Sequence, residues 1–356
     1  MKIALITDTH FGARNDSTIF LDYFTKFYDN IFFPVLEREG IKTIIHLGDI
    51  VDRRKYINYT VLNRLKSCFL KPIMDSGIDL HVIIGNHDVP FRNTNEINSM
   101  NELLGGYGFD KINYYPDPKT VNFDGCDMCF LPWINRSNYS KSMEEIENTP
   151  AQVVMGHLEI EGFLMMRGVM NDHGLHSSLF DRFDVVCSGH FHHKHTKKNI
   201  TYLGSPYEIF WSDYNDNRGF HIFDTETREL EFIKNPYNIF KKHVYEDTDK
   251  TIDQLTELDY SNFKDAYVKV IVQTKTNPYA FDLLLDKLYK SDPAHVSIVD
   301  DHKHLDQKPD EEIFSETEDT LTILTKYVDN LEFSGDNKAL NNLLRNLYQE
   351  AQHVEI

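Results

Sequence analysis

The segment KIALITDTH, residues 2–10, contains the pattern that decides the fold: a short apolar run followed at once by polar residues. An unbroken apolar run, rather than alternation, predicts a strand that is covered on both faces, as in an α/β sheet. Four more segments repeat the pattern, namely TIIHLGD at 43–49, LHVIIGNHD at 80–88, QVVMGH at 152–157 and FDVVCSGHFH at 183–192. The sequence therefore predicts five buried strands, each of which ends in Gly, Asp, Asn or His.

Helical patterns fill the intervals between the first three strands, over roughly 17–39 and 58–76. They end near Gly40 and Gly77, and glycine is frequent just after a helix because it adopts the left-handed conformation without strain. Strands that alternate with helices are typical of an α/β sheet with parallel neighbours.

Residues that can bind metal ions follow the predicted strands. Ligands gather at the carboxyl ends of strands in such sheets, so we expect the five strand ends to converge. Turn chemistry explains Asp, Asn and Gly at one strand end, but it does not explain histidines at so many of them: His10, His87, His157, His190 and His192. Asp8 and His10 are two residues apart, and an extended backbone would point both side chains to one side. The same holds for His190 and His192.

The donor types restrict the metal. A set of Asp, Asn and His side chains without Cys suits manganese, iron or zinc better than calcium. The segment SGHFHHKHTKK, residues 188–198, contains four histidines. We expect His193 and His195 to lie outside the ligand set.

Composition excludes several classes of protein. At 356 residues, with 41% hydrophobic and 26% charged residues, the chain matches a globular protein with one large domain and an accessory, or two domains. No apolar run approaches the roughly 18 residues that a membrane span needs. The N-terminal apolar stretch covers only Ile3 to Ile6, which is too short for a secretory signal. We therefore expect a protein of the cytoplasm that does not contact the membrane.

The formal net charge of −19 is unevenly distributed. Residues 300–320 contain nine acidic and two basic side chains, a local charge of −7, which is typical of a solvated linker. Basic residues cluster elsewhere, for example at 53–55. The charge thus permits a polyanionic substrate, although it argues against tight non-specific binding of nucleic acid by this chain alone.

Two of the four cysteines, Cys126 and Cys129, form a C-x-x-C motif. Such a motif is compatible with redox chemistry or zinc binding, or with two ordinary positions of an apolar strand. No second C-x-x-C motif is present to complete a zinc site. The strand interpretation is therefore favoured.

Five short motifs in order resemble the calcineurin-like metallophosphoesterases. They are D-x-H at Asp8 and His10, G-D-x-x-D at 48–52, G-N-H-D at 85–88, G-H ending at His157, and G-H-x-H at 189–192. Each motif alone is weak evidence for a family, but all five in this order over about 190 residues are specific evidence for this one. The resemblance implies an α/β two-sheet sandwich flanked by helices.

The resemblance also implies a ligand set for two divalent metal ions, for which we expect Mn²⁺, with Mg²⁺ as the alternative. One ion would be held by Asp8, His10, Asp49 and His192. The other would be held by Asp49, Asn86, His157 and His190, so that Asp49 bridges the two. Such a pair of ions promotes in-line displacement at phosphorus by water.

Further roles follow from the same motifs. His87 would stabilise or protonate the leaving group, and Asp88 would orient the His87 ring. Asp52 is also expected to orient His87, because an ionised carboxylate cannot donate a proton. Arg53, Arg54 and Lys55 would contact phosphates along a DNA strand, unless they only form a solvated helix start.

The segment YLGSPYEIFWSD, residues 202–213, resembles the G-S-P segment of the SbcD-type nuclease subunits, and the short chain resembles their phage members most. This implies a metal-dependent DNA exonuclease or endonuclease in recombination, double-strand-break repair and replication. The alternatives are a protein or small-molecule phosphatase of the same superfamily, or a non-catalytic scaffold. A scaffold would be expected to have lost ligands, and none is missing here.

The resemblance implies four regions. We expect a nuclease domain at 1–234, a small α/β capping domain that binds DNA at 235–299, an acidic linker at 300–316 and a helical hairpin at 317–356. Strands are expected at 266–274 and 295–299, with a helix at 280–290 between them. A hairpin tethered by a charged linker either packs back on its own core or binds another chain, and binding is favoured because the linker separates it from the catalytic core. The resemblance implies that the bound chain is a coiled-coil ATPase subunit and that the catalytic domain forms a homodimer.

Overall fold

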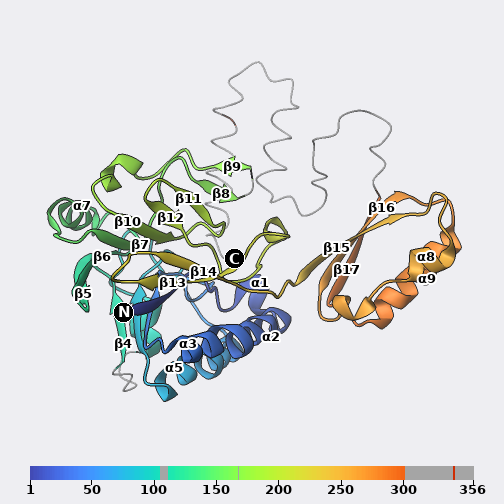
Figure 1. Cartoon of the computed structure of the whole chain (residues 1–356), viewed down its shortest axis with the longest axis horizontal. Helices are drawn as coiled ribbons and strands as arrows, with labels where there is room; N and C mark the ends of the chain where they lie inside the picture. Colours follow the sequence, from blue (N-terminus) through green and yellow to red (C-terminus); the bar gives the residue numbers. More distant parts are fainter. Residues whose placement is uncertain (105–110, 167, 301–339, 341–356) are drawn as a thin grey trace. The chain divides into compact units, whose positions relative to one another are not determined.

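The computed structural model describes residues 1–104, 111–166, 168–300 and 340 (Figure 1). The expected hairpin lies outside these residues apart from residue 340, and so does the expected acidic linker apart from residue 300. The chain forms two compact units, of which the first is Met1–Lys241 and the second begins at Lys242. The first unit extends beyond the expected boundary at residue 234, because the segment after it bonds back: the Asn235 side chain donates to the Pro206 carbonyl at 3.0 Å.

One six-stranded sheet contains the first three predicted strands. Its order is β14 (Leu230–Lys234), β13 (Gly219–Asp224), β1 (Lys2–Ile6), β2 (Thr43–His46), β3 (Asp79–Ile83) and β4 (Ile112–Tyr115). Strands β1 to β4 are parallel, whereas β13 pairs antiparallel with β1 and β14 antiparallel with β13. The carboxyl ends of β1, β2 and β3 therefore lie side by side.

A second six-stranded sheet contains the other two predicted strands. Its order is β11 (His195–Lys197), β12 (Ile200–Tyr202), β10 (Val185–Gly189), β7 (Val153–His157), β6 (Cys126–Leu131) and β5 (Lys119–Phe123). The four central strands are parallel, and β5 and β11 form antiparallel edges. Strands β7 and β10 are neighbours, so their carboxyl ends are also adjacent.

The two sheets pack face to face. Alternate residues of the first sheet, such as Ile3 and Ile45, share one buried cluster with Met128 and Met155 of the second. The strand residues between these core positions point to the outer faces of the sheets, and they are buried as well. Val154 of β7, for example, packs against Ile146 of helix α7 (Tyr139–Asn148). Burial on both faces explains the unbroken apolar runs, and the expected two-sheet sandwich is confirmed.

Two long helical segments lie on the first sheet (Figure 1). They consist of α2 (Thr18–Phe27), η1 (Tyr28–Phe32) and α3 (Phe33–Glu39), and of α4 (Tyr59–Leu65), η2 (Lys66–Leu70) and α5 (Lys71–Asp75). Both end as expected, at Gly40 and Gly77 with φ of 65° and 64°. A five-residue π-helical turn precedes Pro34 and Pro72, because proline has no N–H to donate to the residue four positions earlier.

Smaller elements complete the first unit: α1 (Ala13–Asp16), α6 (Ser99–Leu104), β8 (Leu164–Met166), β9 (Val169–Met170), η3 (Ser177–Phe180) and η4 (Trp211–Asp213). Among the described residues, no helix has both the length and the apolar character needed to cross a membrane.

The C-x-x-C motif lies on strand β6, as the strand interpretation predicted. Cys126 faces the core between the sheets, whereas Cys129 packs on the outer face. Both thiols are free, and burial raises the pKa of Cys129 to about 12. The motif is therefore part of the core rather than a redox or zinc site.

The second unit has a three-stranded sheet in the order β15 (Phe240–Glu246), β16 (Tyr267–Thr274) and β17 (His295–Asp300). Helices α8 (Ile252–Thr256), η5 (Tyr260–Phe263) and α9 (Pro278–Lys290) complete it. Val268 and Val270 of β16 form its core with Phe281 and Leu284 of α9. The expected strands and the helix between them are confirmed, and β15 and α8 are additional.

Candidate metal centre

The candidate ligands lie in the loops that follow β1, β2 and β3 of one sheet and β10 of the other, except His157, which is the last residue of β7. These loops meet at the carboxyl edge of the sandwich, where the side chains form groups whose donor atoms all lie within 4.8 Å of one another. The expected convergence of the five strand ends is confirmed. It follows from the parallel direction of the strands, which sends every one of these loops to the same edge.

The local backbone at the ligands differs from the expected extended conformation. Four candidate ligands have left-handed φ angles, namely Asp8 (51°), His10 (41°), Asp49 (57°) and His190 (89°). The expectation that spacing of two along a strand directs these side chains is wrong, since β1 and β10 end before them. Such conformations cost roughly 1–3 kcal/mol each and are held by surrounding contacts. One contact is the Asp8 N–H, which donates to the Gly48 carbonyl at 3.0 Å.

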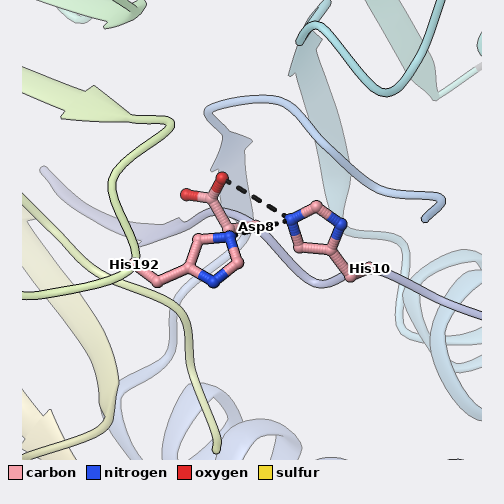
Figure 2. Close-up of side chains that lie close together, drawn as sticks. All are labelled: Asp8, His10 and His192. Atoms are coloured by element: carbon pink, nitrogen blue, oxygen red, sulfur yellow. Dashed lines mark hydrogen bonds and ion pairs between the residues drawn. The ribbon is translucent and has the colours of Figure 1, made fainter. Parts of the chain in front are cut away.

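The first ligand group consists of Asp8, His10 and His192, whose side chains point toward one another (Figure 2). The two Nε2 atoms of the histidines are 3.1 Å apart. Nε2 of His10 is also 4.0 Å from Oδ1 of Asp8. Residues 182 positions apart in the chain thus form one compact set of donors.

The second ligand group consists of Asp49, Asn86, His157 and His190. Oδ1 of Asn86 is 2.9 Å from Nε2 of His157 and 2.9 Å from Nδ1 of His190. Nδ1 of His157 donates to the Leu47 carbonyl at 2.7 Å. Because a carbonyl can only accept, this bond leaves the Nε2 lone pair of His157 directed at the group.

Asp49 lies between the two groups. Its Oδ2 atom is 3.8 Å from Nε2 of His10 in the first group and 3.4 Å from Nε2 of His157 in the second. The position agrees with the bridging role that its motif implies.

The protonation states of the candidate ligands are suited to binding divalent cations. Burial lowers the pKa of His190 to about 3, so its imidazole is neutral and can act as a ligand. Burial also disfavours the charged form of His157, yet Asp49 and Asp8 outweigh this effect and raise its pKa to about 9. Buried carboxylates here attract protons, and a bound cation would replace those protons.

Comparison with known proteins agrees with this geometry. Residues 1–194 match the calcineurin-like phosphoesterase family, which covers all five motifs. The chain belongs to this family. It is 32% identical to exonuclease subunit 1 of Enterobacteria phage T4 over 358 residues, 99% of each chain.

Two further relatives of this phosphoesterase are more distant. The SbcD component of the SbcCD nuclease of Staphylococcus epidermidis is 26% identical over 260 residues, 65% of this chain and 67% of the relative. The DNA double-strand break repair protein Mre11 of Sulfolobus acidocaldarius is 26% identical over 202 residues, 54% of this chain and 50% of the relative.

His87 of the phosphoesterase lies directly beside the ligands. Its main-chain N–H donates to Oδ1 of Asp49 at 2.7 Å, and its ring lies 4.8 Å from that of His10. Nδ1 donates to the Asp52 carbonyl at 2.5 Å. The proton is therefore on Nδ1 and Nε2 is left free, and burial lowers the pKa of the ring.

Asp88 does not orient the His87 ring, contrary to expectation. Its carboxylate accepts hydrogen bonds from the main-chain N–H groups of Asp49 (2.8 Å), Ile50 (3.0 Å) and Gly85 (2.9 Å) and from the Ser99 hydroxyl (3.2 Å). It thereby joins the loops after β2 and β3. The motif spacing did not predict this, because adjacent residues in a turn point in different directions.

Asp52 contacts two histidines through different atoms. Its carboxylate Oδ1 is 3.3 Å from Nδ1 of His10, while only its main-chain carbonyl reaches His87. The Asp52 carboxylate therefore contacts His10 rather than His87, contrary to expectation, and only the backbone of residue 52 orients the His87 ring. Burial opposes ionisation of Asp52, but His10 outweighs it, so the pKa of the carboxyl is lowered. Its negative charge holds the His10 ring in place.

Two glycines allow the loops to approach one another. A Cβ at Gly48, where φ is 99°, would lie 2.5 Å from Nδ1 of His157. A Cβ at Gly85 would lie 2.2 Å from Oδ1 of Asp49. Both positions therefore require glycine, because any side chain would displace a ligand.

The three cations expected to contact phosphate differ in their surroundings. Arg53 is engaged locally: it donates to Oδ1 of Asn15 at 3.0 Å and its Nε is 3.6 Å from Oδ1 of Asp16. Arg54 is half-buried, and its charge acts on Asp49, His87 and His190. Lys55 is exposed. The positive charge of Arg54 helps to lower the pKa of His87 and of His190.

Arg218 hydrogen-bonds the backbone of the candidate ligand His192, which is 26 residues away in the sequence. None of the five motifs includes Arg218, so the sequence analysis missed it. Its side chain is 2% exposed, and its guanidinium donates to the main-chain carbonyl of His192 and to the Ser205 hydroxyl. It also pairs with Asp213 at 2.9 Å and Asp216 at 3.0 Å. The segment SDYNDNRGF, residues 212–220, contains these charges but carries no recognisable pattern.

His193 and His195 lie outside both ligand groups, as expected. Nδ1 of His193 is 2.6 Å from Oδ2 of Asp216, which links it to the Arg218 network. His195 belongs to strand β11, and its Nδ1 accepts from the Leu164 N–H at 3.1 Å.

Replacement of Arg218 by Gln should lower the free energy of unfolding by about 3–5 kcal/mol, because it leaves buried Asp213 unpaired. Arg228→Gln is the matched control, since Arg228 pairs with Asp184 at the surface and its loss should cost at most about 1 kcal/mol. Urea unfolding of both variants measures the difference. Equal effects would show that the Arg218 network does not stabilise the fold.

Proposed function

We propose that this phosphoesterase is a metal-dependent DNA nuclease that hydrolyses phosphodiester bonds in recombination, double-strand-break repair and replication. The observation that carries the proposal is the pair of ligand groups joined by Asp49. Similarity to exonuclease subunit 1 of phage T4 over 99% of both chains supports the same substrate class. Cleavage would be exonucleolytic, endonucleolytic or both.

The ligand groups would hold two divalent ions, Mn²⁺ in preference to Mg²⁺. Asp8, His10, Asp49 and His192 would bind one of them. The other would be bound by Asp49, Asn86, His157 and His190. When bound, the ions supply Lewis acidity toward the phosphoryl group and lower the pKa of water toward neutrality.

The surrounding residues would position the substrate and the leaving group. The Nε2 atom of His87 lies beside the first ligand group, while Nδ1–H stays on the Asp52 carbonyl. Because a phosphate or leaving-group oxygen only accepts, His87 would bind it in the protonated form, which the negative charge of the substrate favours. Asp52 holds both His87 and His10 in orientation. Arg54 adds positive charge where a phosphate would lie, which favours the polyanionic substrate.

Incubation of the purified protein with linear DNA and Mn²⁺, with and without chelator, tests the proposal. We expect cleavage only with metal. A phosphomonoester such as p-nitrophenyl phosphate serves as the comparison. Fast hydrolysis of the monoester with no cleavage of DNA would favour a phosphatase, and no hydrolysis of either would favour a scaffold.

We further propose the partners of the nuclease. DNA would contact the second unit as well as the centre, and the catalytic domain would form a homodimer. A coiled-coil ATPase subunit would bind residues 317–356, which, apart from residue 340, lie outside the described residues. Two relatives are named as subunits of nucleases, which supports an assembly. The protein would act in the cytoplasm, that of the host if a phage encodes it.

Truncation after residue 305 should leave Mn²⁺-dependent DNA cleavage intact, because every candidate ligand precedes that point. It should abolish binding of the ATPase subunit and any stimulation by ATP. Pull-down with the ATPase, together with thermal melting of the truncated protein, measures both effects. Retained binding, or unfolding of the truncated chain, would contradict the assignment of residues 317–356.

A further inference from the structure

Two aromatic side chains flank the ligand groups, and the proposed chemistry does not use them. The ring of Phe210 lies 6.0 Å from that of His192 in the first group, nearly parallel to it at 17°. The indole of Trp133 lies 5.0 Å from the ring of His190 and 6.2 Å from that of His157 in the second group. The ring of Phe191 also lies 5.0 Å from that of His190 but is buried, so Phe210 and Trp133 are the accessible aromatic neighbours among these three.

Phe210 is exposed but held on a rigid support. Its side chain is 42% exposed, although Ile209 before it is fully buried. The main-chain N–H groups of both residues donate to Oδ2 of Asp213, at 2.8 Å and 2.9 Å. Asp213 is fixed in turn by its ion pair with Arg218. An exposed ring on so constrained a backbone is not explained by packing of the core.

Trp133, in the segment after β6, is held as firmly. Its main-chain N–H donates to the Ile84 carbonyl at 2.8 Å. Its own carbonyl accepts from three asparagine side chains: Asn95 (3.0 Å), Asn138 (3.0 Å) and Asn135 (3.5 Å). The indole is half-buried, so part of it remains accessible next to the second ligand group.

We propose that Phe210 and Trp133 are stacking positions for nucleobases, so that the centre takes DNA as unpaired nucleotides rather than as intact duplex. The inference rests on the proposed nuclease function and deepens it by naming the substrate class. In a duplex each base is stacked on its neighbours and its faces are covered. Only a single strand, or a frayed end, exposes base faces to aromatic rings.

The charge of the protein supports this mode of binding. With a formal net charge of −19, the chain as a whole repels DNA, and Arg54 adds one positive charge that acts on His87 and His190. Phosphate contacts alone would therefore hold a strand weakly. Stacking requires no positive charge and accepts every base, which suits a nuclease without sequence preference.

The first test compares a single-stranded oligonucleotide with an abasic strand of equal length, using Mn²⁺-loaded protein. The wild type should cleave the base-bearing strand with the lower KM. Phe210→Ala and Trp133→Ala should each raise that KM by about 5- to 100-fold, the contribution of one base–aromatic stack. Neither variant should change cleavage of the abasic strand. Tyr139→Ala is the matched control, since Tyr139 is 52% exposed on α7 and touches no candidate ligand.

The second test needs no catalysis. The chain contains two tryptophans, Trp133 and Trp211, so Trp211→Phe leaves Trp133 as the only indole emitter. In the presence of chelator, oligothymidylate should quench the emission of Trp133 in this variant. The abasic strand should leave the emission unchanged.

The outcomes separate the inference from the proposed function. Quenching by oligothymidylate without any DNA cleavage by the wild type would overturn the nuclease but support the stacking positions. Cleavage with the same KM for both strands and no quenching would overturn the stacking positions alone. Loss of bound metal or of kcat at unchanged KM in the two alanine variants would also overturn them, since the rings would then only support His190 and His192.

Discussion

Replacement of Asp8 or His190 by Ala should reduce DNA cleavage by about 10³-fold or more, to below detection. Each substitution removes a donor from one ligand group, and a metal ion contributes several kcal/mol to stabilisation of charge in the transition state. Mn²⁺-dependent hydrolysis of linear DNA and elemental analysis of the purified variants measure the loss of activity and of metal together.

The control must show that the fold survives. Asp8 accepts from the Thr7 hydroxyl at 2.8 Å and from the His190 N–H, so its removal also loses hydrogen bonds. Thermal melting therefore accompanies each assay. Asp172→Ala and His173→Ala are matched controls, because these side chains are 80% and 75% exposed and lie outside both ligand groups. Full activity of His190→Ala, or cleavage in metal-free buffer, would contradict the two-metal centre.

The second large effect concerns His87. Replacement by Ala should reduce kcat for DNA cleavage by about 10²- to 10⁴-fold, the usual range for general acid or electrostatic assistance. The variant should keep its metals, because His87 is proposed to contact the substrate rather than a metal. Its Nδ1 already donates to the Asp52 carbonyl, so only Nε2 is free for this role.

Metal content decides between the two possible roles of His87. A donor atom of its ring lies within 4.8 Å of donors of His10 and Asp49, which is close enough for a ligand. Loss of a metal ion together with activity would therefore place His87 among the ligands. His176→Ala provides the control, since its side chain is 68% exposed. This control should retain both metal and activity.

Local sequence predicted much of the fold because burial on both faces leaves an unbroken apolar run wherever it occurs. The strands β1, β2, β3, β7 and β10 were each visible in this way, and helix ends were visible at Gly40 and Gly77. The C-terminal boundary of the first unit was not visible. It depends on contacts such as that of Asn235 with Pro206, which join segments with no shared pattern.

The candidate ligands were predictable for a related reason, since each is adjacent to a strand end and has a metal-binding side chain. Their directions were not predictable. Asp8 and His190 adopt left-handed conformations in tight turns, where a spacing of two residues no longer means a common side. For the same reason Asp88 binds the loop after β2 rather than the ring of the adjacent His87.

The sequence by itself determined which segments become buried strands and which donors follow them, because both depend on neighbours in the chain. The motifs, through their resemblance to a known family, also predicted how the donors divide into two groups around Asp49, whereas the tertiary structure brought these donors together. It alone placed the Arg218 guanidinium against the His192 carbonyl, 26 residues away, and set Trp133 and Phe210 beside different ligand groups. These contacts depend on how the two sheets pack. They join residues that are remote in the sequence, so no periodic pattern of neighbouring residues reveals them.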